Sequence, residues 1–415
     1  MQQQYGTRAL ACVVDERTAR GAVRIGERGA ARLRAGHPWV YRSDVTRAPR
    51  AAGFAPVEGP AGRPLGWAAV HPTSQIAVRL VHGGDAPVDE AFLLRRLDEA
   101  LERRERLRGD PDAGMEHVDG YRLVHAEADG LPGLVVDRLG PVLTLQNGCA
   151  ALEPHVDALC ERLMARLATA GVIGVLGRLD AAVREREGLE RSVRVLAGEV
   201  PERIEVGDGV LRWPLEPLAG QKTGTFLDQR LNHRRLARFA RGRCLDVFSY
   251  QGGFGLHLLH AGAEAVTLVD SSAAALAAAR TAAERNALPA PLTVRADAFE
   301  HLRSLEQRGE RFDVIALDPP ALAKRARDLP RALAGYKELN LRAMRLLAPG
   351  GVLGTASCSA HVQDAEFMNV LADAAADAGR TVHVLGRFGA APDHPERLGF
   401  PESAYLSFVL LRPVD

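Results

Sequence analysis

Strand-like and helix-like segments alternate along the C-terminal half of the chain, from about residue 203 onward. The strand-like runs are short and mostly apolar, and the segments between them have the apolar spacing of helices. Such an alternation predicts an α/β fold with a doubly wound parallel sheet. The expected elements, in chain order, are residues 244–248, 255–260, 265–269, 273–286, 292–295, 313–317, 336–347, 351–355, 366–378, 381–385 and 405–411.

The N-terminal half has a different organisation. Its first 85 residues contain short alternating apolar runs bounded by glycine and proline, such as residues 39–41 and 76–81, and these predict a small β-rich domain. A helix is expected over residues 89–108. Strands, a turn and a helix follow within residues 121–170, which predicts a small α+β domain. We therefore expect domains over residues 1–85, 86–202 and 203–415.

Composition excludes several classes of protein. The chain is 47% hydrophobic and 25% charged, as is typical of a soluble globular protein. No apolar run is long enough to span a membrane, and residues 1–10 lack the apolar stretch of a signal peptide, so we expect a cytoplasmic protein with no membrane partner. The five cysteines are scattered without a CxxC pair, which argues against a disulfide framework, a zinc site or an iron–sulfur site. We therefore expect no bound metal.

Charge gives a local signal only. The net charge is +1, but residues 1–50 hold ten arginines against four acidic residues. This excess can bind phosphates, or it can be a solvated face, and charge alone does not separate the two. A second basic group, which could form an RNA-facing rim or a solvated loop, comprises Lys324, Arg325, Arg327 and Arg331.

The loop after the first strand of the C-terminal domain is a candidate binding element. Ser249, Tyr250, Gly252 and Gly253 follow Phe248 at the carboxyl end of that strand, where open α/β sheets bind ligands. Glycines let the backbone approach a ligand closely. The G-x-G-x-x-G spacing of pyrophosphate sites is absent, which favours a nucleoside cofactor without phosphate. An ordinary turn between strand and helix is the alternative.

Carboxylates follow the next two strands. Asp270 ends the second strand, beside Ser271, and can accept hydrogen bonds from the ribose hydroxyls of an adenosine-type cofactor. Asp297 and Ala298 follow the third strand, where the carboxylate could accept the exocyclic amine of adenine. Capping of the next helix is the simpler role for Asp297.

Two further strand ends carry the candidate chemistry. Asp318 is followed by two prolines, which fix a rigid turn at the end of the fourth strand, and Cys358 follows the fifth strand. A thiolate that adds to carbon 6 of a pyrimidine makes carbon 5 reactive toward a sulfonium methyl group. Asp318, on the Watson–Crick edge of the base, can stabilise the charged adduct. The alternative for Cys358 is a buried structural cysteine.

Several motifs together resemble the bacterial 23S ribosomal RNA cytosine-C5 methyltransferases, over nearly the whole chain. That family combines a PUA domain, a central α+β domain and a C-terminal class I methyltransferase domain. The segments that carry the resemblance are 34–41 (RAGHPWVY), 129–138 (DGLPGLVVDR), 181–188 (AAVREREG), 222–230 (KTGTFLDQR), 248–254 (FSYQGGF), 318–320 (DPP), 335–340 (GYKELN) and 357–359 (SCS).

The resemblance implies S-adenosyl-L-methionine as the cofactor and Cys358 as the nucleophile. It also implies that Asp270, Asp297 and Asp318 line the cofactor and base pockets, and that Asp228 and Arg230 lie near the methionine end of the cofactor. The PUA-like domain would bind RNA, with 23S ribosomal RNA as the expected partner. A homodimer is left open. The chain departs from the family pattern at Ala321, Leu322 and Gln251, where the family often has lysine, an aromatic residue and threonine.

Three classes of function remain in competition. The first is a cytosine-C5 RNA methyltransferase, with methylation of another base such as guanine as its nearest variant. The second is a nicotinamide-dependent oxidoreductase, against which the missing dinucleotide fingerprint argues. The third is a non-catalytic RNA-binding factor. Only Cys358 and Asp318 favour an enzyme over such a factor.

Overall fold

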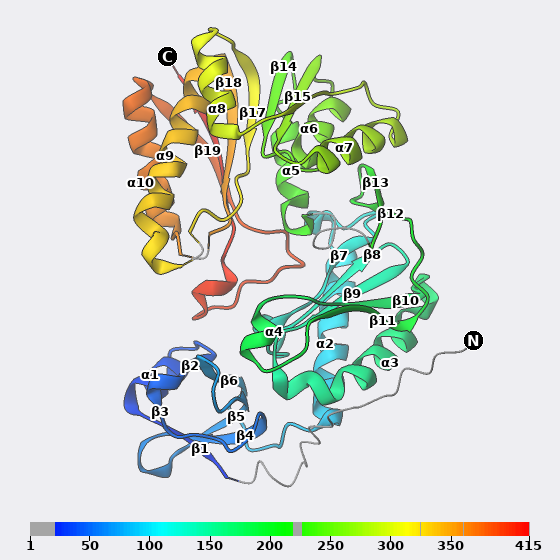
Figure 1. Cartoon of the computed structure of the whole chain (residues 1–415), viewed down its shortest axis with the longest axis vertical. Coiled ribbons are helices and arrows are strands. Elements are labelled where there is room, and N and C mark those ends of the chain that lie inside the picture. Colours follow the sequence, from blue (N-terminus) through cyan, green and yellow to red (C-terminus); the bar gives the residue numbers. More distant parts are fainter. Residues whose placement is uncertain (1–20, 219–225, 324, 360, 415) are drawn as a thin grey trace, which may run out of the picture.

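A computed structural model describes residues 21–218, 226–323, 325–359 and 361–414. The predictions that concern the first ten residues, Cys12, Lys222–Thr225 and Lys324 therefore lie outside the described residues. Figure 1 shows a small N-terminal domain, a central domain and a C-terminal domain arranged along the long axis. In the part of the chain that is described, no helix is both long enough and apolar enough to cross a membrane.

The N-terminal domain is a six-stranded sheet with one helix. Its strands follow the order β2-β6-β5-β4-β1-β3, in which only β1 and β4 pair in parallel. Valines and alanines of these strands form its small core with α1. The elements are β1 (Val23–Ile25), α1 (Glu27–Arg34), β2 (Trp39–Tyr41), β3 (Val45–Arg47), β4 (Gly53–Glu58), β5 (Pro64–Val70) and β6 (Ile76–His82).

The central domain packs helices against a five-stranded sheet of order β11-β10-β9-β8-β7. The long helix α2 begins where the carboxylate of Asp89 accepts a hydrogen bond from the Phe92 N–H at 2.7 Å, which satisfies a free donor of the first turn. The elements are α2 (Glu90–Arg108), β7 (Gly120–His125), β8 (Leu134–Leu139), β9 (Val142–Asn147), α3 (Val156–Leu167), β10 (Gly174–Leu179), α4 (Val183–Arg186) and β11 (Ser192–Gly198).

A two-stranded hairpin, β12 (Ile204–Gly207) and β13 (Arg212–Leu215), lies between the central and C-terminal domains (Figure 1). Its apolar side chains join the core of the C-terminal domain, in which Val206 and Trp213 are buried. The hairpin brings the turn residue Asp208 to the edge of that domain.

The C-terminal domain is built on a seven-stranded sheet of order β16-β15-β14-β17-β18-β20-β19. The last strand, β20, pairs in antiparallel fashion with both β18 and β19, and the other pairs in this sheet are parallel. The elements are α5 (Arg230–Ala237), β14 (Arg243–Val247), α6 (Gly253–His260), β15 (Ala265–Asp270), α7 (Ala273–Arg285), β16 (Leu292–Arg295), α8 (Ala298–Gln307), β17 (Phe312–Leu317), α9 (Leu329–Leu346), β18 (Leu347–Ser357), α10 (Asp364–Ala378), β19 (Val382–Phe388) and β20 (Ser407–Pro413).

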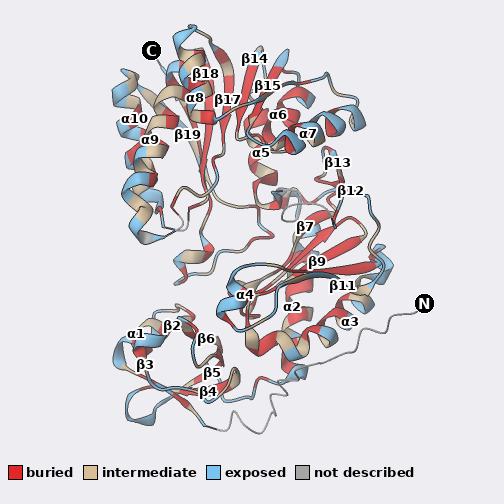
Figure 2. Cartoon of the chain, in the orientation of Figure 1, coloured by how far each residue is buried: buried red, intermediate tan, exposed pale blue. Residues whose placement is uncertain are grey.

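Helices cover both faces of this sheet, and its strands are buried between them (Figure 2). Side chains alternate along each strand, so Cys244 packs with α5–α7 on one face while Leu245 and Val247 pack with α8–α10 on the other. This arrangement confirms the predicted doubly wound α/β fold. It also places the carboxyl ends of β14, β15, β17 and β18 at one edge of the sheet.

The prediction differs from the structure in several elements. Strands β10 to β13 were not predicted, and α9 begins seven residues earlier than expected. Its start coincides with Pro330, a residue that fits the first turn of a helix because its missing N–H would have no partner there. The predicted boundaries at residues 85 and 202 remain predictions.

The segment between β19 and β20, residues 389–406, runs down to the other two domains (Figure 1). Phe400 packs edge to face against Trp39 of the N-terminal domain, with ring centroids 4.8 Å apart. The indole N–H of Trp39 donates to the Glu127 carboxylate at 2.8 Å, and the Arg397 guanidinium donates to the Glu127 carbonyl at 3.2 Å. The predicted PUA motif therefore lies at a junction of three domains.

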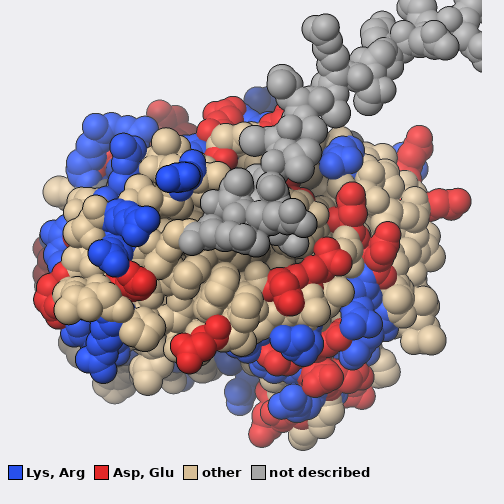
Figure 3. Space-filling view, turned by 90° about the horizontal axis from the view of Figure 1, so that it is seen from below, with Lys and Arg blue, Asp and Glu red and all other residues tan. Residues whose placement is uncertain are grey.

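The basic excess near the N-terminus is partly neutralised. Arg24, Arg28 and Arg34 pair with Glu58, Asp44 and Glu27. Seen from the side of the N-terminal domain, basic side chains gather in places and are mixed with acidic ones elsewhere (Figure 3). The described part of this region therefore presents a mixed surface.

Candidate functional site

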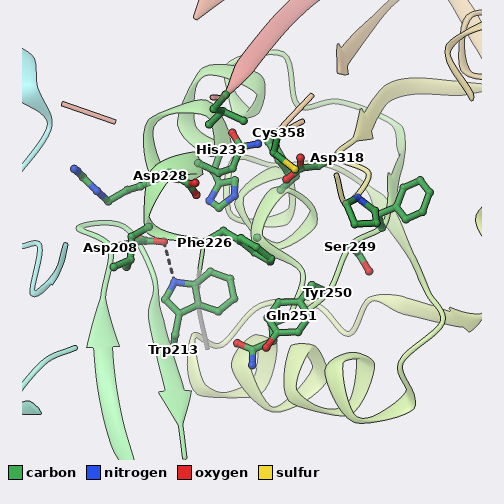
Figure 4. A pocket seen from close by; sticks show the side chains of 18 of the residues that line it. Asp208, Trp213, Phe226, Asp228, His233, Ser249, Tyr250, Gln251, Asp318 and Cys358 are labelled. Atoms are coloured by element: carbon green, nitrogen blue, oxygen red, sulfur yellow. Dashed lines mark hydrogen bonds between the residues drawn. The ribbon is translucent and has the colours of Figure 1, made fainter. Parts of the chain in front are cut away.

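One pocket of about 520 Å³ lies at the carboxyl edge of the large sheet and extends to the hairpin. The lining comes from the strand-end loops, the start of α5, the hairpin and the segment before β20. Its residues include Asp208, Trp213, Phe226, Asp228, Arg230, His233, Phe248, Ser249, Tyr250, Gly253, Asp270, Ser271, Asp318, Cys358 and Tyr405. The sequence-based prediction thus placed most of its candidate residues at one real cavity (Figure 4).

The loop after β14 has an unusual backbone. Phe248 and Tyr250 have φ angles of 62° and 49°, a left-handed conformation that costs free energy in residues other than glycine. Hydrogen bonds from the Ser249 N–H to the Val269 carbonyl and from the Gly252 N–H to the Ser249 carbonyl hold this shape. The Ser249 hydroxyl is buried at the pocket with no hydrogen-bond partner among the described residues. A polar group in that position can receive a ligand.

Asp270 is fixed at the pocket by its own loop. Its two carboxylate oxygens accept the Tyr250 N–H at 2.9 Å and the Ser272 N–H at 2.8 Å. Each oxygen keeps a free lone pair, so the carboxylate can also accept two hydroxyl groups of a ribose. The geometry agrees with the predicted role, which remains a prediction.

Replacing Asp270 by alanine is expected to weaken the binding of S-adenosylhomocysteine by about 10- to 100-fold, because two charge-assisted hydrogen bonds are lost. Calorimetric titration of the full-length chain measures this. Glu264→Ala is the matched control. Glu264 is exposed and lies just before the first residue of β15, whereas Asp270 is the last residue of that strand. Equal affinity in both variants would remove Asp270 from the site.

Asp318 lies at the end of β17, partly open to the pocket and otherwise enclosed by protein. This enclosure raises the pKa of its carboxyl group to about 7, and the carboxylates of Asp228 and Asp246 act in the same direction. Asp228 in turn accepts a 2.6 Å hydrogen bond from the hydroxyl of Tyr405. Asp318 therefore has both a protonated and an ionised form available near neutral pH.

Cys358 lies in the loop after β18 and lines the same pocket as Asp318. Its sulfur is 3.7 Å from the Pro319 carbonyl, so the thiol and the Asp-Pro-Pro turn are immediate neighbours. Ser359 fixes the position of this loop. Its hydroxyl forms a hydrogen bond with the Tyr336 hydroxyl at 2.9 Å and accepts one from the Ala323 N–H at 3.3 Å. The structure thus holds the thiol half-exposed at the pocket, whereas Cys149, Cys160 and Cys244 are buried.

Three predicted cofactor contacts do not line the pocket. Gly252 has a φ of 82°, and a Cβ there would meet Leu256 and Leu268, so the residue serves the turn and the core. Asp297 accepts the Glu300 N–H at 3.0 Å as the N-cap of α8, and Ala298 is the buried first residue of that helix. A strand end fixes a residue's edge but not the direction of its side chain, and the cofactor contacts of these three residues stay predictions.

Arg230 borders the pocket, but its guanidinium is directed elsewhere. It donates to the Gly114 carbonyl at 2.6 Å and to the Asp393 carboxylate at 2.9 Å. The side chain therefore joins the central domain to the segment before β20. A direct contact with the methionine end of the cofactor does not fit these bonds.

Sequence reasoning missed several residues at or beneath this pocket. Tyr405, Trp213 and His233 line it, and Asp246 lies beneath the loop with one carboxylate oxygen bonded to the Gly255 N–H at 2.8 Å. Burial raises the pKa of Asp246 to about 7. Burial and the neighbouring His257 hold the pKa of His233 well below its ordinary value. Asp246 could have been found as the polar residue inside an apolar strand.

These residues fit a nucleoside cofactor. The strand-end loop brings its backbone and the unpartnered Ser249 hydroxyl to the pocket, and Asp270 supplies acceptors for a ribose. The loop does not form the glycine cradle that a pyrophosphate requires.

Comparisons with known proteins agree with this fit. A family model described as S-adenosylmethionine-dependent methyltransferase matches residues 127–410, and a PUA-like domain model matches residues 23–82. The chain is 38% identical over 383 residues to ribosomal RNA large subunit methyltransferase I of Photobacterium profundum, covering 90% of this chain and 94% of that one. The enzyme of the same name from Aeromonas salmonicida is 38% identical over 388 residues, covering 91% and 95%.

Solved structures share the whole fold. A putative methyltransferase in complex with S-adenosylhomocysteine superposes with a TM-score of 0.81 at 17% identity, covering 94% of this chain and 99% of the other. A putative S-adenosylmethionine-dependent methyltransferase from Streptococcus mutans gives a TM-score of 0.79 at 18% identity with the same coverage. The chain therefore belongs to the S-adenosylmethionine-dependent methyltransferase family that includes the ribosomal RNA large subunit methyltransferases I.

Proposed function

We propose that this methyltransferase forms 5-methylcytosine in the 23S RNA of the large ribosomal subunit, through a covalent bond between Cys358 and the base. The observation that carries the proposal is that Cys358 and Asp318 line one pocket together with the strand-end loop that fits the cofactor. The names of the relatives, which are large-subunit ribosomal RNA methyltransferases, support the substrate class. The PUA-like domain supports RNA as the partner.

The thiolate of Cys358 adds to carbon 6 of the cytosine, and the electron pair of the carbon 5–carbon 6 double bond then becomes available at carbon 5. S-adenosyl-L-methionine, which the strand-end loop and Asp270 would hold, would supply a sulfonium methyl group to carbon 5 and leave as the thioether. A base then removes the proton from carbon 5, the double bond re-forms, and the bond between carbon 6 and the Cys358 sulfur breaks. This sequence returns the cysteine as a thiolate.

Asp318 acts on the other edge of the ring. Addition at carbon 6 places negative charge on nitrogen 3 and the carbonyl of the base, and a protonated carboxyl group stabilises that charge by hydrogen bonding to nitrogen 3. With a pKa of about 7, Asp318 carries this proton in about half of the molecules at neutral pH.

The pH profile tests this role. The protonated form of Asp318 is the active one and is lost above its pKa, so kcat/KM is expected to fall as the pH rises through about 7. Asp318→Asn is expected to lower kcat/KM about 100-fold and to remove this alkaline limb, since an amide is a weaker hydrogen-bond donor than a carboxylic acid and does not ionise. A profile that is the same in both proteins would contradict the assignment.

The direct test of the proposed function is to treat 23S RNA from a strain lacking the enzyme with the full-length chain and a labelled methyl donor. Mass mapping of the digested RNA identifies the modified nucleoside. Labelled 5-methylcytosine at one position is the expected product. Labelled methylguanosine would instead indicate a guanine methyltransferase. No labelled nucleoside, with RNA that the protein still binds, would indicate a non-catalytic RNA-binding factor.

A further inference from the structure

Three buried side chains that the proposed reaction does not use meet beside the pocket. Asp208 comes from the turn of the β12–β13 hairpin, His233 from α5 and His257 from α6. One ligand atom from each lies within 4.8 Å of the others, and all three residues are buried. Figure 4 shows Asp208 and His233 at the wall of the cavity, with the hydrogen bond from Trp213 to Asp208 as a dashed line.

The contacts of the two ring nitrogens of His257 define the centre of this cluster. Its Nδ1 is 2.7 Å from the Gly253 carbonyl, which can only accept, so Nδ1 carries a hydrogen. In a singly protonated ring Nε2 then carries a lone pair, and it faces Asp208 Oδ2 at 3.3 Å. Either a second ring proton or a metal ion can lie between these two atoms, and His257 Nε2 is buried with no hydrogen-bond partner among the described residues. Two ligands bound to Zn²⁺ at about 2.0–2.1 Å in tetrahedral geometry are themselves about 3.3 Å apart.

Hydrogen bonds from neighbouring groups fix the side chains of His257 and Asp208. Such bonds usually orient the ligands of a metal ion in proteins. The Gly253 carbonyl fixes the His257 ring, which is the usual arrangement for a metal-bound histidine. Asp208 Oδ1 accepts the N–H groups of Val210 and Leu211 at 2.9 and 2.8 Å. Asp208 Oδ2 accepts the Trp213 indole N–H at 2.8 Å and keeps a lone pair for a metal.

His233 completes the set. Across the described ranges, no hydrogen bond reaches its ring, although only 8% of the residue is exposed. It lines the pocket, so a metal ion can reach its imidazole from the pocket. Two imidazoles and one carboxylate suit Zn²⁺ and its first-row neighbours, whereas Mg²⁺ and Ca²⁺ prefer oxygen ligands only.

We propose that Asp208, His233 and His257 bind one divalent transition-metal ion, with Zn²⁺ as the best fit, at the wall of the cofactor pocket. The proposal departs from the sequence-based expectation of no metal, which rested on cysteine spacing. It is independent of which base the enzyme methylates.

Metal analysis of the full-length chain tests the site. The protein is purified without chelator and its metal content measured, and the stripped protein is then titrated with Co²⁺, whose visible absorption reports nitrogen ligands. One equivalent of bound metal with Co²⁺ bands is expected. His233→Ala and His257→Ala are expected to weaken Co²⁺ binding by more than the roughly 10- to 100-fold that loss of an outer-shell partner costs.

His260→Ala is the matched control, because His260 is exposed at the end of the same helix as His257, and it is expected to bind Co²⁺ as the parent does. Circular dichroism identifies any variant that fails to fold, and His233→Ala, at the pocket wall, then decides the test. Absence of stoichiometric metal, or Co²⁺ spectra that are identical in the parent and His233→Ala, would overturn the proposal. A doubly protonated His257 ring, seen by nitrogen NMR in metal-treated protein, would also overturn it.

Discussion

Cys358→Ala is expected to lower the rate of methyl transfer by at least about 1,000-fold, which corresponds to about 4 kcal/mol in the activation barrier. Without a thiolate on carbon 6, carbon 5 of a cytosine is too weak a nucleophile to take a methyl group. The affinity for S-adenosylhomocysteine is expected to stay within about twofold, because the substituted side chain leaves the strand-end loop unchanged. Single-turnover assays and calorimetry measure the two quantities.

Cys244→Ala is the matched control for this prediction. Cys244 is buried near the amino end of β14, the strand beside β17, whereas the pocket lies at the carboxyl ends of the strands. The variant is therefore expected to retain full activity. Cys358→Ser keeps the size and polarity of the side chain but not its nucleophilicity, so it is expected to be as inactive as Cys358→Ala. Turnover at the parent rate in either Cys358 variant would end the covalent mechanism.

Asp393→Ala is expected to lower the free energy of unfolding by about 3–5 kcal/mol, because it leaves a buried charge without its partner. The carboxylate of Asp393 is fully buried and accepts the Arg230 guanidinium at 2.9 Å and the Arg122 N–H at 2.8 Å. Its backbone carbonyl accepts the Arg104 guanidinium at 3.0 Å. These bonds fasten the segment before β20 to the central domain. Urea denaturation at pH 7, followed by tryptophan fluorescence, measures the loss.

The pH dependence of this effect has a defined sign. Burial alone would raise the pKa of Asp393, but His394, Arg230 and the Arg122 N–H outweigh it and hold the pKa well below its ordinary value of 3.8. The native state therefore binds fewer protons than the unfolded state, and the stabilisation is present above pH 3.8 and lost as the pH falls. The difference in the free energy of unfolding between the parent and Asp393→Ala is therefore expected to shrink as the pH falls below 3.8.

Asp373→Ala, at an exposed position of α10, is the control and is expected to change stability by less than about 0.5 kcal/mol. If Asp393→Ala unfolds at the same urea concentration as this control, the domain junction does not depend on the buried pair. If Asp393→Ala loses stability as expected while S-adenosylhomocysteine still binds, the segment of residues 389–406 stabilises the contact between domains.

The connection between Asp393 and the pocket is short. The same segment carries Tyr405, whose hydroxyl donates to Asp228 at the pocket wall. It also carries Phe400, which packs against Trp39 of the PUA-like domain. One loop thus joins the predicted RNA-binding domain, the central domain and the site, so these parts are fixed relative to one another by buried contacts.

The sequence alone determined the sheet and one edge of the site. Apolar runs alternating with helices specify parallel strands, and the carboxyl ends of such strands meet at one edge because each crossover helix returns the chain to the same side. Ser249, Asp270, Asp318 and Cys358 each follow a strand, so their meeting at one pocket could be expected from their positions in the chain.

Only the tertiary structure decided the opposite wall and the direction of individual side chains. Asp208, His233 and Tyr405 come from a hairpin turn, a helix and a long loop. Their meeting depends on how distant segments of the chain pack, which leaves no local pattern in the sequence. Asp297 and Arg230 have suitable positions in the chain, but backbone torsions and buried partners turn their side chains to a helix cap and a domain junction. Local periodicity fixes elements and their edges, whereas side-chain direction and contacts between distant segments arise only from the packing of the whole chain.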